Sequence, residues 1–581
     1  MLQRFSKFKM LNNVQHQMFS GLKYLRMLSL IGCHMTILSD EISNLKLLRY
    51  LDLSQNKITS LPDSICMLYN LQTLILECCK LTELPSGFCK LISLRHLYLK
   101  DNKLKKMPKL IGRLNHLHTL TDFVVGEHSG YDIKELAELN HLQGTLHISG
   151  LQNVIDPADA MTANLKDKKH LEGLRMTYGS TRKMAGLTME RHVSILEALQ
   201  PNNNLKWLTI VGYQGISFPN WLDVCHLPNL VSLNLMSCKF CTQLPPFGLF
   251  PYLKMLSISY FPQIEIISSL NVLFRSLEIL RFKNMSNWKE WLCVEGFPLL
   301  KELSITNCPK LKKSLPQHLP SLEILIIRNC QELEASIPES HNIHKLVLRG
   351  CENILVNEFP SNLKEVFLGG TRVIESHLEQ ILLNNVFLKD LGVADFNGVC
   401  QDWSNLCSFN SIRSLTITGW HSSSFTFAWD LFINLYSLNL YDCPLLDSIS
   451  GEGLPLSLTR IEIQRCPKLI ASIEELGLNK LCSLRMVKVS DDFVESFPKE
   501  NLLPPTINTL RLDCCPKLRI IDIKGFQHLK SLKLLSISRC CCLEHLSGED
   551  LPESLSALDI YGCPLLQCHN IAHIPSVEIT E

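Results

Sequence analysis

The chain of 581 residues has almost no charge imbalance and no long apolar run. Its 57 Lys and Arg residues are offset by 56 Asp and Glu residues, which leaves a formal net charge of +1. Because phosphate neutralisation needs a surplus of positive charge, we expect no nucleic-acid partner. No apolar run reaches the roughly 18 residues of a membrane span, and residues 1–10 lack the apolar core of a secretory signal. We therefore expect neither a membrane protein nor a secreted one.

Catalytic and nucleotide-binding motifs are also missing. The sequence contains no H-E-x-x-H and no G-x-S-x-G, and its 20 histidines have no partner at a catalytic spacing. It contains no Gly-Lys dipeptide, which excludes the phosphate-binding loop G-x-x-x-x-G-K-[ST]. We expect no enzyme and no cofactor.

Cysteine, in contrast, is plentiful, with 24 residues. Because nothing indicates secretion, we expect reduced thiols in a protein of the cytoplasm or the nucleus. A C-x-x-C at 238–241 and a Cys/His cluster at 540–545 with Cys568 lack a second ligand pair at zinc spacing. No metal site is expected.

The dominant feature of the sequence is an internal repeat. Leu48, Leu71 and Leu94 each begin an L-x-x-L-x-L pattern, at intervals of 23 residues. Further starts run from Leu25 to Leu555, with about 23 units of about 24 residues, although those around 117–145 and near Leu388 rest on spacing alone. This is the leucine-rich repeat, one strand and an irregular or helical return per unit. It predicts an α/β leucine-rich-repeat solenoid, a curved arc with parallel strands on its concave face and the returns on its convex face.

The repeat also accounts for many of the cysteines. The position three residues after the last leucine of the pattern is commonly Asn or Cys, because the chain turns inward there and backbone groups need side-chain partners. Asn56 and Asn102 occupy it in two early repeats. Eleven cysteines occupy it elsewhere: Cys33, Cys79, Cys238, Cys308, Cys330, Cys351, Cys443, Cys466, Cys515, Cys540 and Cys563. We expect these thiols to be small buried groups.

Two stretches, 121–195 and 370–410, interrupt the rhythm. In the first, apolar residues three apart between 133 and 142 indicate a helical face. Asp156 as N-cap and Pro157 as first residue predict a helix that runs to Leu171. A third helix is expected to end at Pro201. The expected organisation is a lead-in at 1–20, regular repeats at 21–120, irregular repeats at 121–200, degenerate repeats at 201–570 and a tail at 571–581.

Several segments resemble the leucine-rich-repeat region of plant intracellular immune receptors of the coiled-coil, nucleotide-binding class (NLR proteins). The first pair is LRMLSL at 25–30 with LKLLRYLDL at 45–53. The most specific set is LEALQP at 196–201, NLK at 204–206, GY at 212–213 and FPNWL at 218–222. LPPFG at 244–248 and LKMLSI at 253–258 follow it. Trp288, Trp291 and Trp420 are expected to fill the core or its turns.

This resemblance implies a role in plant defence, in which the repeats bind a pathogen effector or a guarded host protein, or restrain a nucleotide-binding switch domain. Such receptors carry that domain before the repeats, and this sequence lacks its phosphate-binding loop. The chain is therefore expected to correspond to the repeat region alone, and we do not expect it to bind a nucleotide.

Candidate partner-binding residues lie at the strand positions between buried leucines, which point outward. They are Tyr50, Asp52, His96, Tyr98, Lys100, Trp207 and Thr209. Exposed aromatic side chains can anchor a protein partner. The alternative is that each is an ordinary surface side chain of the sheet.

A basic run follows Lys100 and contains Lys103, Lys105, Lys106, Lys109 and Arg113. Two interpretations remain open for it. It is either a solvated convex or edge face, or a docking patch for a switch domain, as the resemblance implies.

A second functional class also remains open. Leucine-rich repeats serve as substrate-recruiting arms of ubiquitin ligases. That function would need an F-box-like helical segment ahead of the repeats, and the 20 residues before them are too short for one.

Overall fold

The computed structural model describes residues 3–4, 18–128, 130–179, 188–268, 274–292, 296–312, 315–354, 359–385, 387–397, 410–426, 429, 432–450, 453–521, 523–547, 549 and 551–580. Unit 1 comprises Met1–Glu302 with Asn307–Leu311, and unit 2 comprises Leu303–Thr306 with Lys312–Glu581. Of the predicted lead-in at 1–20, all but residues 3–4 and 18–20 lie outside the described residues.

Unit 1 begins with a parallel sheet in which every strand pairs only with its neighbours along the chain. The strand order is the sequence order. Its strands are β1 (Gln3–Arg4), β2 (Met27–Ser29), β3 (Tyr50–Asp52), β4 (Thr73–Ile75), β5 (His96–Tyr98) and β6 (Thr119–Leu120). The register keeps equivalent leucines side by side, for example Leu28, Leu51 and Leu74.

A second parallel sheet continues in unit 1. Its strands there are β7 (Asp122–Val124), β8 (Gln143–Ser149), β9 (His170–Thr177), β10 (Trp207–Val211), β11 (Ser232–Met236), β12 (Met255–Ser259) and β14 (Ile279–Lys283). Two short strands, β13 (Ile266–Ser268) and β15 (Glu290–Leu292), pair with each other in a separate sheet. β16 (Glu302–Thr306) lies at the boundary of the units.

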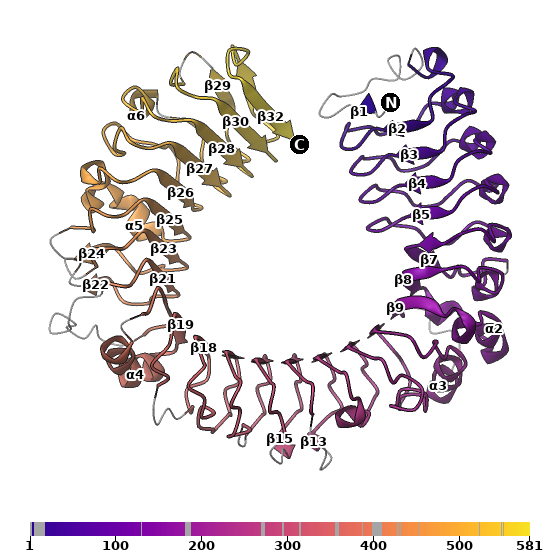
Figure 1. The fold of residues 1–581 in the computed structure, drawn as a ribbon. Helices are drawn as coiled ribbons and strands as arrows, with labels where there is room; N and C mark the ends of the chain where they lie inside the picture. The colour runs from indigo at the N-terminus through magenta and orange to yellow at the C-terminus, as the bar shows by residue number, and fades with distance from the viewer. Residues whose placement is uncertain are drawn as a thin grey trace. The chain divides into compact units, whose positions relative to one another are not determined.

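The returns of unit 1 are mostly single 3-10 turns. These are η1 (Asp40–Asn44), η2 (Asp63–Met67), η3 (Phe88–Lys90), η4 (Ile111–Arg113), η5 (Ile133–Leu136), η6 (Leu151–Asn153), η7 (Leu165–Asp167) and η8 (Phe247–Leu249). The α-helices α2 (Pro157–Thr162) and α3 (Met189–Ala198) lie on the side of the sheet away from its inner face (Figure 1).

The predicted helices of the irregular stretch are partly confirmed. Asp156 caps α2, because its side chain accepts the N–H of Ala158. The extension to Leu171 was wrong, since α2 ends at Thr162 and Leu171 lies in β9. Leu171 fits the spacing of a helical face, but it is a buried residue of the strand β9. The expected third helix is α3, which ends at Ala198, just before Pro201.

Unit 2 repeats the same arrangement. Its ladder strands are β17 (Ile324–Arg328), β18 (Lys345–Arg349), β19 (Glu365–Gly369), β20 (Asp390–Ala394), β21 (Ser414–Thr418), β23 (Ser437–Tyr441), β25 (Arg460–Gln464), β26 (Met486–Ser490), β27 (Thr509–Asp513), β28 (Leu534–Ser538), β30 (Ala557–Tyr561) and β32 (Ser576–Thr580). Two short parallel pairs stand apart from the ladder: β22 (Ser424–Thr426) with β24 (Ser448–Ser450), and β29 (His545–Ser547) with β31 (Gln567–His569). The repeat inferred near Leu388 is real, because β20 follows it directly.

Helical returns also occur in unit 2. They are α4 (Thr371–Asn384), α5 (Pro467–Ala471), η11 (Ile473–Leu476), η12 (Leu478–Lys480) and α6 (Ile523–Phe526). α4 lies in the second predicted irregular stretch, whose residues 398–409 are outside the described part of the chain. These parallel ladders and their returns confirm the leucine-rich-repeat solenoid.

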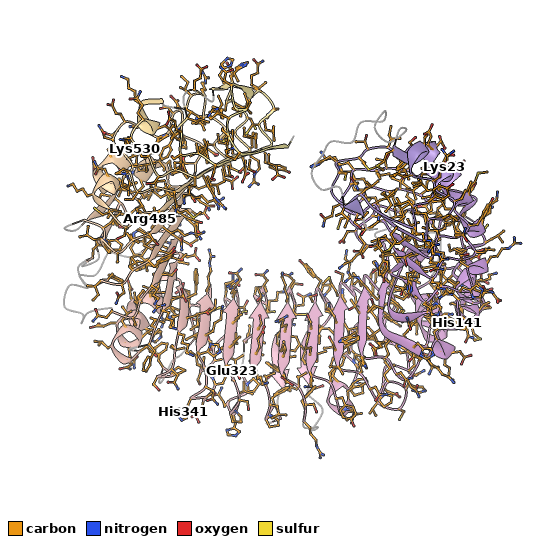
Figure 2. All side chains as sticks on the ribbon, turned by 45° about the horizontal axis from the view of Figure 1, so that its top comes forward. Lys23, His141, Glu323, His341, Arg485 and Lys530 are labelled. Atoms are coloured by element: carbon orange, nitrogen blue, oxygen red, sulfur yellow. The ribbon has the colours of Figure 1, made fainter. Side chains whose placement is uncertain are left out.

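The core of each unit lies between its ladder strands and its returns. The leucines of the pattern, such as Leu51, Leu74 and Leu97, are fully buried there, as are Trp288, Trp291 and Trp420. The alternate strand side chains stand on the opposite face of the ladder, which we call the strand face (Figure 2).

The turn after each strand is closed by the predicted side chains. Asn56 accepts the N–H of Met35 at 3.0 Å and donates to the carbonyls of Leu30 and Leu53 at 2.8 and 2.7 Å. Cys79 has the same role with a weaker donor, since its Sγ lies 3.3 Å from the Leu53 carbonyl. Burial raises the pKa of the Cys79 thiol, which favours the neutral form.

Of the eleven cysteines assigned to this turn, ten are buried. Cys563, in the repeat that contains β30, is only half-buried. All eleven are free thiols in the structure.

The turn after β26 holds a carboxylate. Asp491 is 1% exposed, and its Oδ1 accepts the N–H of Phe493 at 2.9 Å. Its Oδ2 has no hydrogen-bond partner among the described residues. Burial raises the pKa of Asp491, although the N–H groups of Phe493 and Cys466 act to lower it.

This carboxylate predicts a pH-dependent stability. An acid whose pKa is raised on folding favours the folded state below its unfolded pKa, about 4, and this stability is lost as the pH rises through the folded value. Asp491→Asn should therefore stabilise the chain at pH 7 by about 1–3 kcal/mol, because it removes an unpaired buried charge and adds a donor. The stability difference between the Asn variant and the original chain should become smaller towards pH 4. Thermal melts of both proteins between pH 4 and pH 7 measure this difference. A gain that is independent of pH would contradict the assignment.

Candidate functional site

The strand face of unit 1 has a seam where the first sheet ends and the second begins. Thr121 lies between β6 and β7 and connects the two sheets. Its Oγ1 accepts the N–H of Leu99 at 2.8 Å, and its carbonyl accepts the N–H of His147 at 2.9 Å. Beyond the seam, β8 and β9 are longer than the strands before them, and their register shifts at Gly144 and Thr145.

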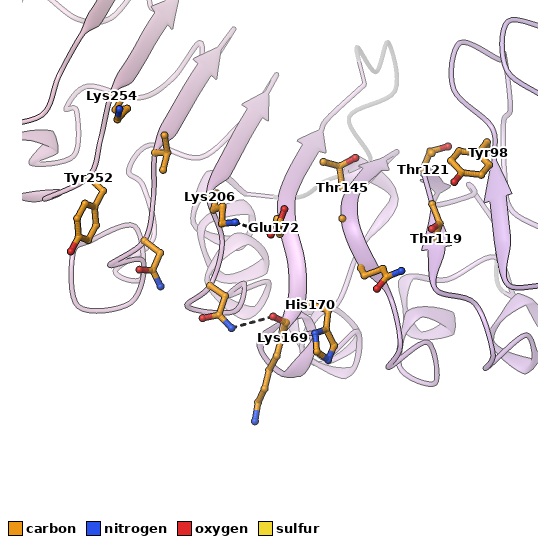
Figure 3. A pocket seen from close by; sticks show the side chains of 15 residues that line it. Tyr98, Thr119, Thr121, Thr145, Lys169, His170, Glu172, Lys206, Tyr252 and Lys254 are labelled. Atoms are coloured by element: carbon orange, nitrogen blue, oxygen red, sulfur yellow. Dashed lines mark hydrogen bonds and ion pairs between the residues drawn. The ribbon is translucent and has the colours of Figure 1, made fainter.

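A large hollow of about 1040 Å³ lies over this seam, and we call it the seam hollow. Tyr98 lines it at one end and Tyr252 at the other (Figure 3). The rest of the lining includes six Thr, Asn and Gln side chains, which carry neutral hydrogen-bonding groups, and four charged side chains. Such a surface combines two aromatic anchors with polar groups that can orient a partner.

The charged side chains of the seam hollow are mostly paired. Lys206 lies 2.8 Å from Glu172 (Figure 3). Lys254 lies 2.9 Å from Glu278. Hydrogen bonds from Lys254 and Lys301 lower the pKa of Glu278. Lys169 forms no ion pair with a described residue, so the hollow keeps a small excess of positive charge.

Next to the seam hollow, Trp207 stands on the strand face with 44% of its surface exposed. The register places it beside Gly173 of β9. A Cβ at position 173 would lie 2.6 Å from Cγ2 of Thr145 and 3.6 Å from Cε3 of Trp207. The absence of a side chain at 173 therefore leaves room for the indole ring. The two residues share a second hollow of about 570 Å³, the tryptophan hollow, with Thr121 and Thr145.

A polar row crosses the tryptophan hollow. Nδ1 of His147 lies 2.9 Å from Oδ1 of Asp122, and its Nε2 lies 2.9 Å from Oγ1 of Thr177. Because both ring nitrogens have partners, the imidazole is fixed in place. Arg175 and Thr209 line the same hollow.

Among the predicted contact residues, Asp52 requires a correction. Its side chain is only 5% exposed and accepts the N–H and hydroxyl of Ser54 at 3.0 and 2.6 Å. Tyr50 donates to its other oxygen at 3.3 Å. Asp52 therefore stabilises the turn after β3 and does not point to a partner. Burial, followed by the charge of Asp52, raises the pKa of Tyr50.

The remaining predicted residues lie on the strand face. Tyr98 lines the seam hollow, while Lys100, Trp207 and Thr209 line the tryptophan hollow. His96 is half-buried, with its Nδ1 3.1 Å from Thr119 Oγ1. Its ring lies 6.0 Å from that of His118, which lies 6.0 Å from His141 (labelled in Figure 2). Burial, followed by the positive neighbours His118 and Arg95, lowers the pKa of His96.

The basic run lies beside the strand face, on the return between β5 and η4. Lys103, Lys105, Lys109 and Arg113 are exposed. Lys106 is half-buried, with its Nζ 4.5 Å from the centre of the Tyr131 ring and 3.7 Å from Glu83. Nζ of Lys109 lies 5.2 Å from the same ring. Tyr131 therefore holds two of the lysines in position.

In the part of the chain that the structure describes, no group of three or more His, Cys, Asp or Glu residues could hold a metal ion. No helix in those residues is both long and apolar enough to cross a bilayer.

Sequence reasoning missed the residues that shape the two hollows. Thr121, Gly173 and the Lys206–Glu172 pair acquire their roles from contacts between repeats, at separations of 22 to 34 residues. Arg175 could have been found, because it occupies an outward strand position of β9.

The parallel ladder, the leucine pattern and the side chain that closes each turn define a leucine-rich-repeat protein. Residues 47–68 and 70–91 match the general family model Leucine Rich Repeat. Residues 133–261, which include Trp207 and most of the seam hollow, match the family described as R13L1/DRL21 LRRs. Part of the chain is similar to the leucine-rich repeats of proteins named as plant disease resistance proteins.

Relatives of known name support this. At3g14460, named as a disease resistance protein of Arabidopsis thaliana, is 40% identical over 227 residues, which cover 35% of this chain and 16% of the relative. The RPP13-like protein 1 of the same plant is 38% identical over 35% of this chain and 21% of its own length. Disease resistance protein RGA2 of Solanum bulbocastanum is 36% identical over 35% of this chain and 22% of its own length. The matched part of the chain thus spans about a fifth of each relative.

Solved leucine-rich-repeat structures are more distant. The TLR13 chain of the TLR13–ssRNA13 complex aligns at 16% identity over 94% of this chain and 86% of its own, with a TM-score of 0.43.

The packing of Trp207 over Gly173 predicts a local effect of substitution. Gly173→Val should crowd Thr145 and the indole ring and cost about 1–3 kcal/mol. The backbone amides of β8 to β10 should then exchange hydrogen roughly 5- to 150-fold faster, as measured by peptide-level mass spectrometry. Gly21→Val is the control, because a Cβ there would meet nothing within 4 Å. Equal exchange in both variants would contradict the packing described.

Proposed function

We propose that the strand face of unit 1 between β5 and β12 recognises a protein partner, without catalysis, in plant defence. The partner is a pathogen effector or a guarded host protein, bound in the cytoplasm or the nucleus. The observation that carries this proposal is the exposed Trp207, whose ring packs beside Gly173. The two hollows near it are lined by polar side chains, several of which are held by hydrogen bonds.

Physical reasons support a protein partner. A surface that combines exposed aromatic rings with neutral hydrogen-bonding groups is typical of the centre of a protein interface. Tyr98, Trp207 and Tyr252 supply the rings here. The region matched by the R13L1/DRL21 family contains two of these three. The relatives are named as disease resistance proteins, which does not favour the arm of a ubiquitin ligase.

The proposal predicts selective loss of partners. The tagged full chain, expressed in leaf tissue, should co-purify a protein whose recovery drops at least tenfold with Trp207→Ala, as expected for an anchor worth about 2 kcal/mol. Tyr69→Ala is the matched control, because Tyr69 is 50% exposed on a return and lies off the strand face. Its variant should retain the partner within twofold. Recovery that falls equally in both variants, or in neither, would contradict recognition at Trp207.

We further propose that the basic run is a docking patch for a nucleotide-binding switch domain. Tyr131 holds Lys106 and Lys109 side by side, so their positive charges are presented in a fixed arrangement. A relative's nucleotide-binding domain, supplied separately, should bind this chain with an affinity that falls as salt rises.

Charge reversal tests this docking patch. The double variant Lys105→Glu/Lys109→Glu should weaken that binding by at least tenfold, as measured by calorimetry. The Lys23→Glu/Lys57→Glu variant is the control, because it changes the net charge equally outside the basic run. Equal weakening by the two variants would show a general charge effect and contradict a docking patch.

A further inference from the structure

Unit 1 contains a largely apolar cavity of about 580 Å³ that reaches the core and is partly open to solvent. Its walls come from the ladder strands β12 and β14 on one side and from the outer strands β13 and β15 on the other. The segment 242–248, which includes the start of η8, completes the lining. The volume lies within the range of about 300–1,000 Å³ that is usual for small-molecule pockets.

Aromatic rings dominate one wall of the cavity. Phe274 and Phe297 stack with their ring centres 4.9 Å apart and an interplanar angle of 18°. Trp291 meets Phe297 and Phe282 edge-on, at 6.1 and 5.4 Å. These rings pack against one another and line the cavity together. Offset-stacked and edge-to-face contacts are the arrangements that a further aromatic ring prefers.

No charged side chain lines the cavity among the residues that the structure describes. The polar side chains of the lining are those of Thr242, Gln243 and Ser268, which are all neutral. A charged ligand would lose its hydration here without gaining a partner charge. The lining therefore favours an uncharged ligand.

One polar group of the wall lacks a partner. Trp291 is 4% exposed, and its indole N–H donates no hydrogen bond to any residue in the described part of the chain. The other buried tryptophans nearby do donate: Trp288 to the carbonyl of Glu290 and Trp221 to that of Leu196, both at 2.9 Å. The indole nitrogen of Trp291 is not among the fully buried polar atoms that lack a partner, so its N–H is accessible and can meet a ligand. Trp291 thus provides a donor for an acceptor that the described residues do not supply.

We propose that this cavity binds an uncharged aromatic small molecule that carries a neutral hydrogen-bond acceptor, such as a carbonyl group. The ring packs against Phe274, Phe297 and Trp291, and the acceptor receives the indole N–H. The site is on the core side of β12 and β14, separate from Trp207 on the strand face, so it does not depend on the proposed protein recognition.

The environment-sensitive dye prodan tests this proposal on the full chain. Prodan is an uncharged naphthalene with a ketone, and its emission shifts to the blue in apolar surroundings. We expect a saturable blue shift with a stoichiometry of one dye per chain. Absence of saturable binding would overturn the proposal.

A cavity-filling variant locates the dye. Ile267 is the buried middle residue of β13 and lines the cavity. Ile267→Phe should fill part of the space, weaken prodan binding at least tenfold and keep or raise the melting temperature. Leu546→Phe is the matched control, since Leu546 is the buried middle residue of the outer strand β29 and does not line this cavity. It should lower the melting temperature and leave binding within twofold. Unchanged binding in Ile267→Phe would overturn the proposal.

The acceptor is tested with a pair of dyes. Trp291→Phe keeps a ring on the wall but removes the N–H, so prodan should bind roughly fivefold more weakly, the value of one ordinary hydrogen bond. 2-(Dimethylamino)naphthalene, which lacks the ketone, should bind this variant and the original chain equally. An equal loss for both dyes would overturn the role of the indole N–H. Circular dichroism of each variant shows whether it is folded.

Discussion

Every repeat of this chain depends on the next one to cover its leucines. A strand of two to eight residues with a helical or irregular return has no interior of its own, so the apolar side chains are buried only by stacking. The parallel ladder fixes the register of that stacking, and Leu28, Leu51 and Leu74 lie side by side because of it. The turn side chains add to this constraint. Asn56 and Cys79 reach carbonyl groups of the preceding repeat, so the same residues that end one strand hold it against its neighbour.

The sites that we propose for this chain lie where the regular stacking of the repeats is disturbed. At Thr121 one sheet gives way to the next, and at Gly144 and Thr145 the register shifts. Both hollows of the strand face lie at this place. On the core side, the outer strands β13 and β15 stand away from β12 and β14 and leave the aromatic cavity between them. A ladder of identical repeats would offer neither a seam nor a cavity.

The architecture could be predicted from the sequence because the leucine pattern determines burial directly. Even the weak repeat near Leu388 and the cysteines of the turns follow from spacing. The errors have local causes. Asp52 alternates with buried leucines, as an outward residue should, but the N–H and hydroxyl of Ser54 hold it inside. The predicted helix was drawn too long because Leu171, a strand residue, happens to fit the helical spacing. The packing of Trp207 could not be predicted, because it depends on which residue of β9 lies beside it in the ladder. That residue is Gly173, 34 positions earlier in the chain.

Each ladder strand pairs only with the ladder strands of the adjacent repeats, and this has a consequence for how the gene can change. In most folds the loss of 23 residues removes contacts from distant parts of the chain. Here, deletion or duplication of one whole unit joins two equivalent edges and leaves every other contact unchanged. Unequal crossing-over between such units can thus lengthen or shorten the gene while the protein still folds. A lineage can therefore change the span of its binding surface in a single genetic event, without passing through unfolded intermediates.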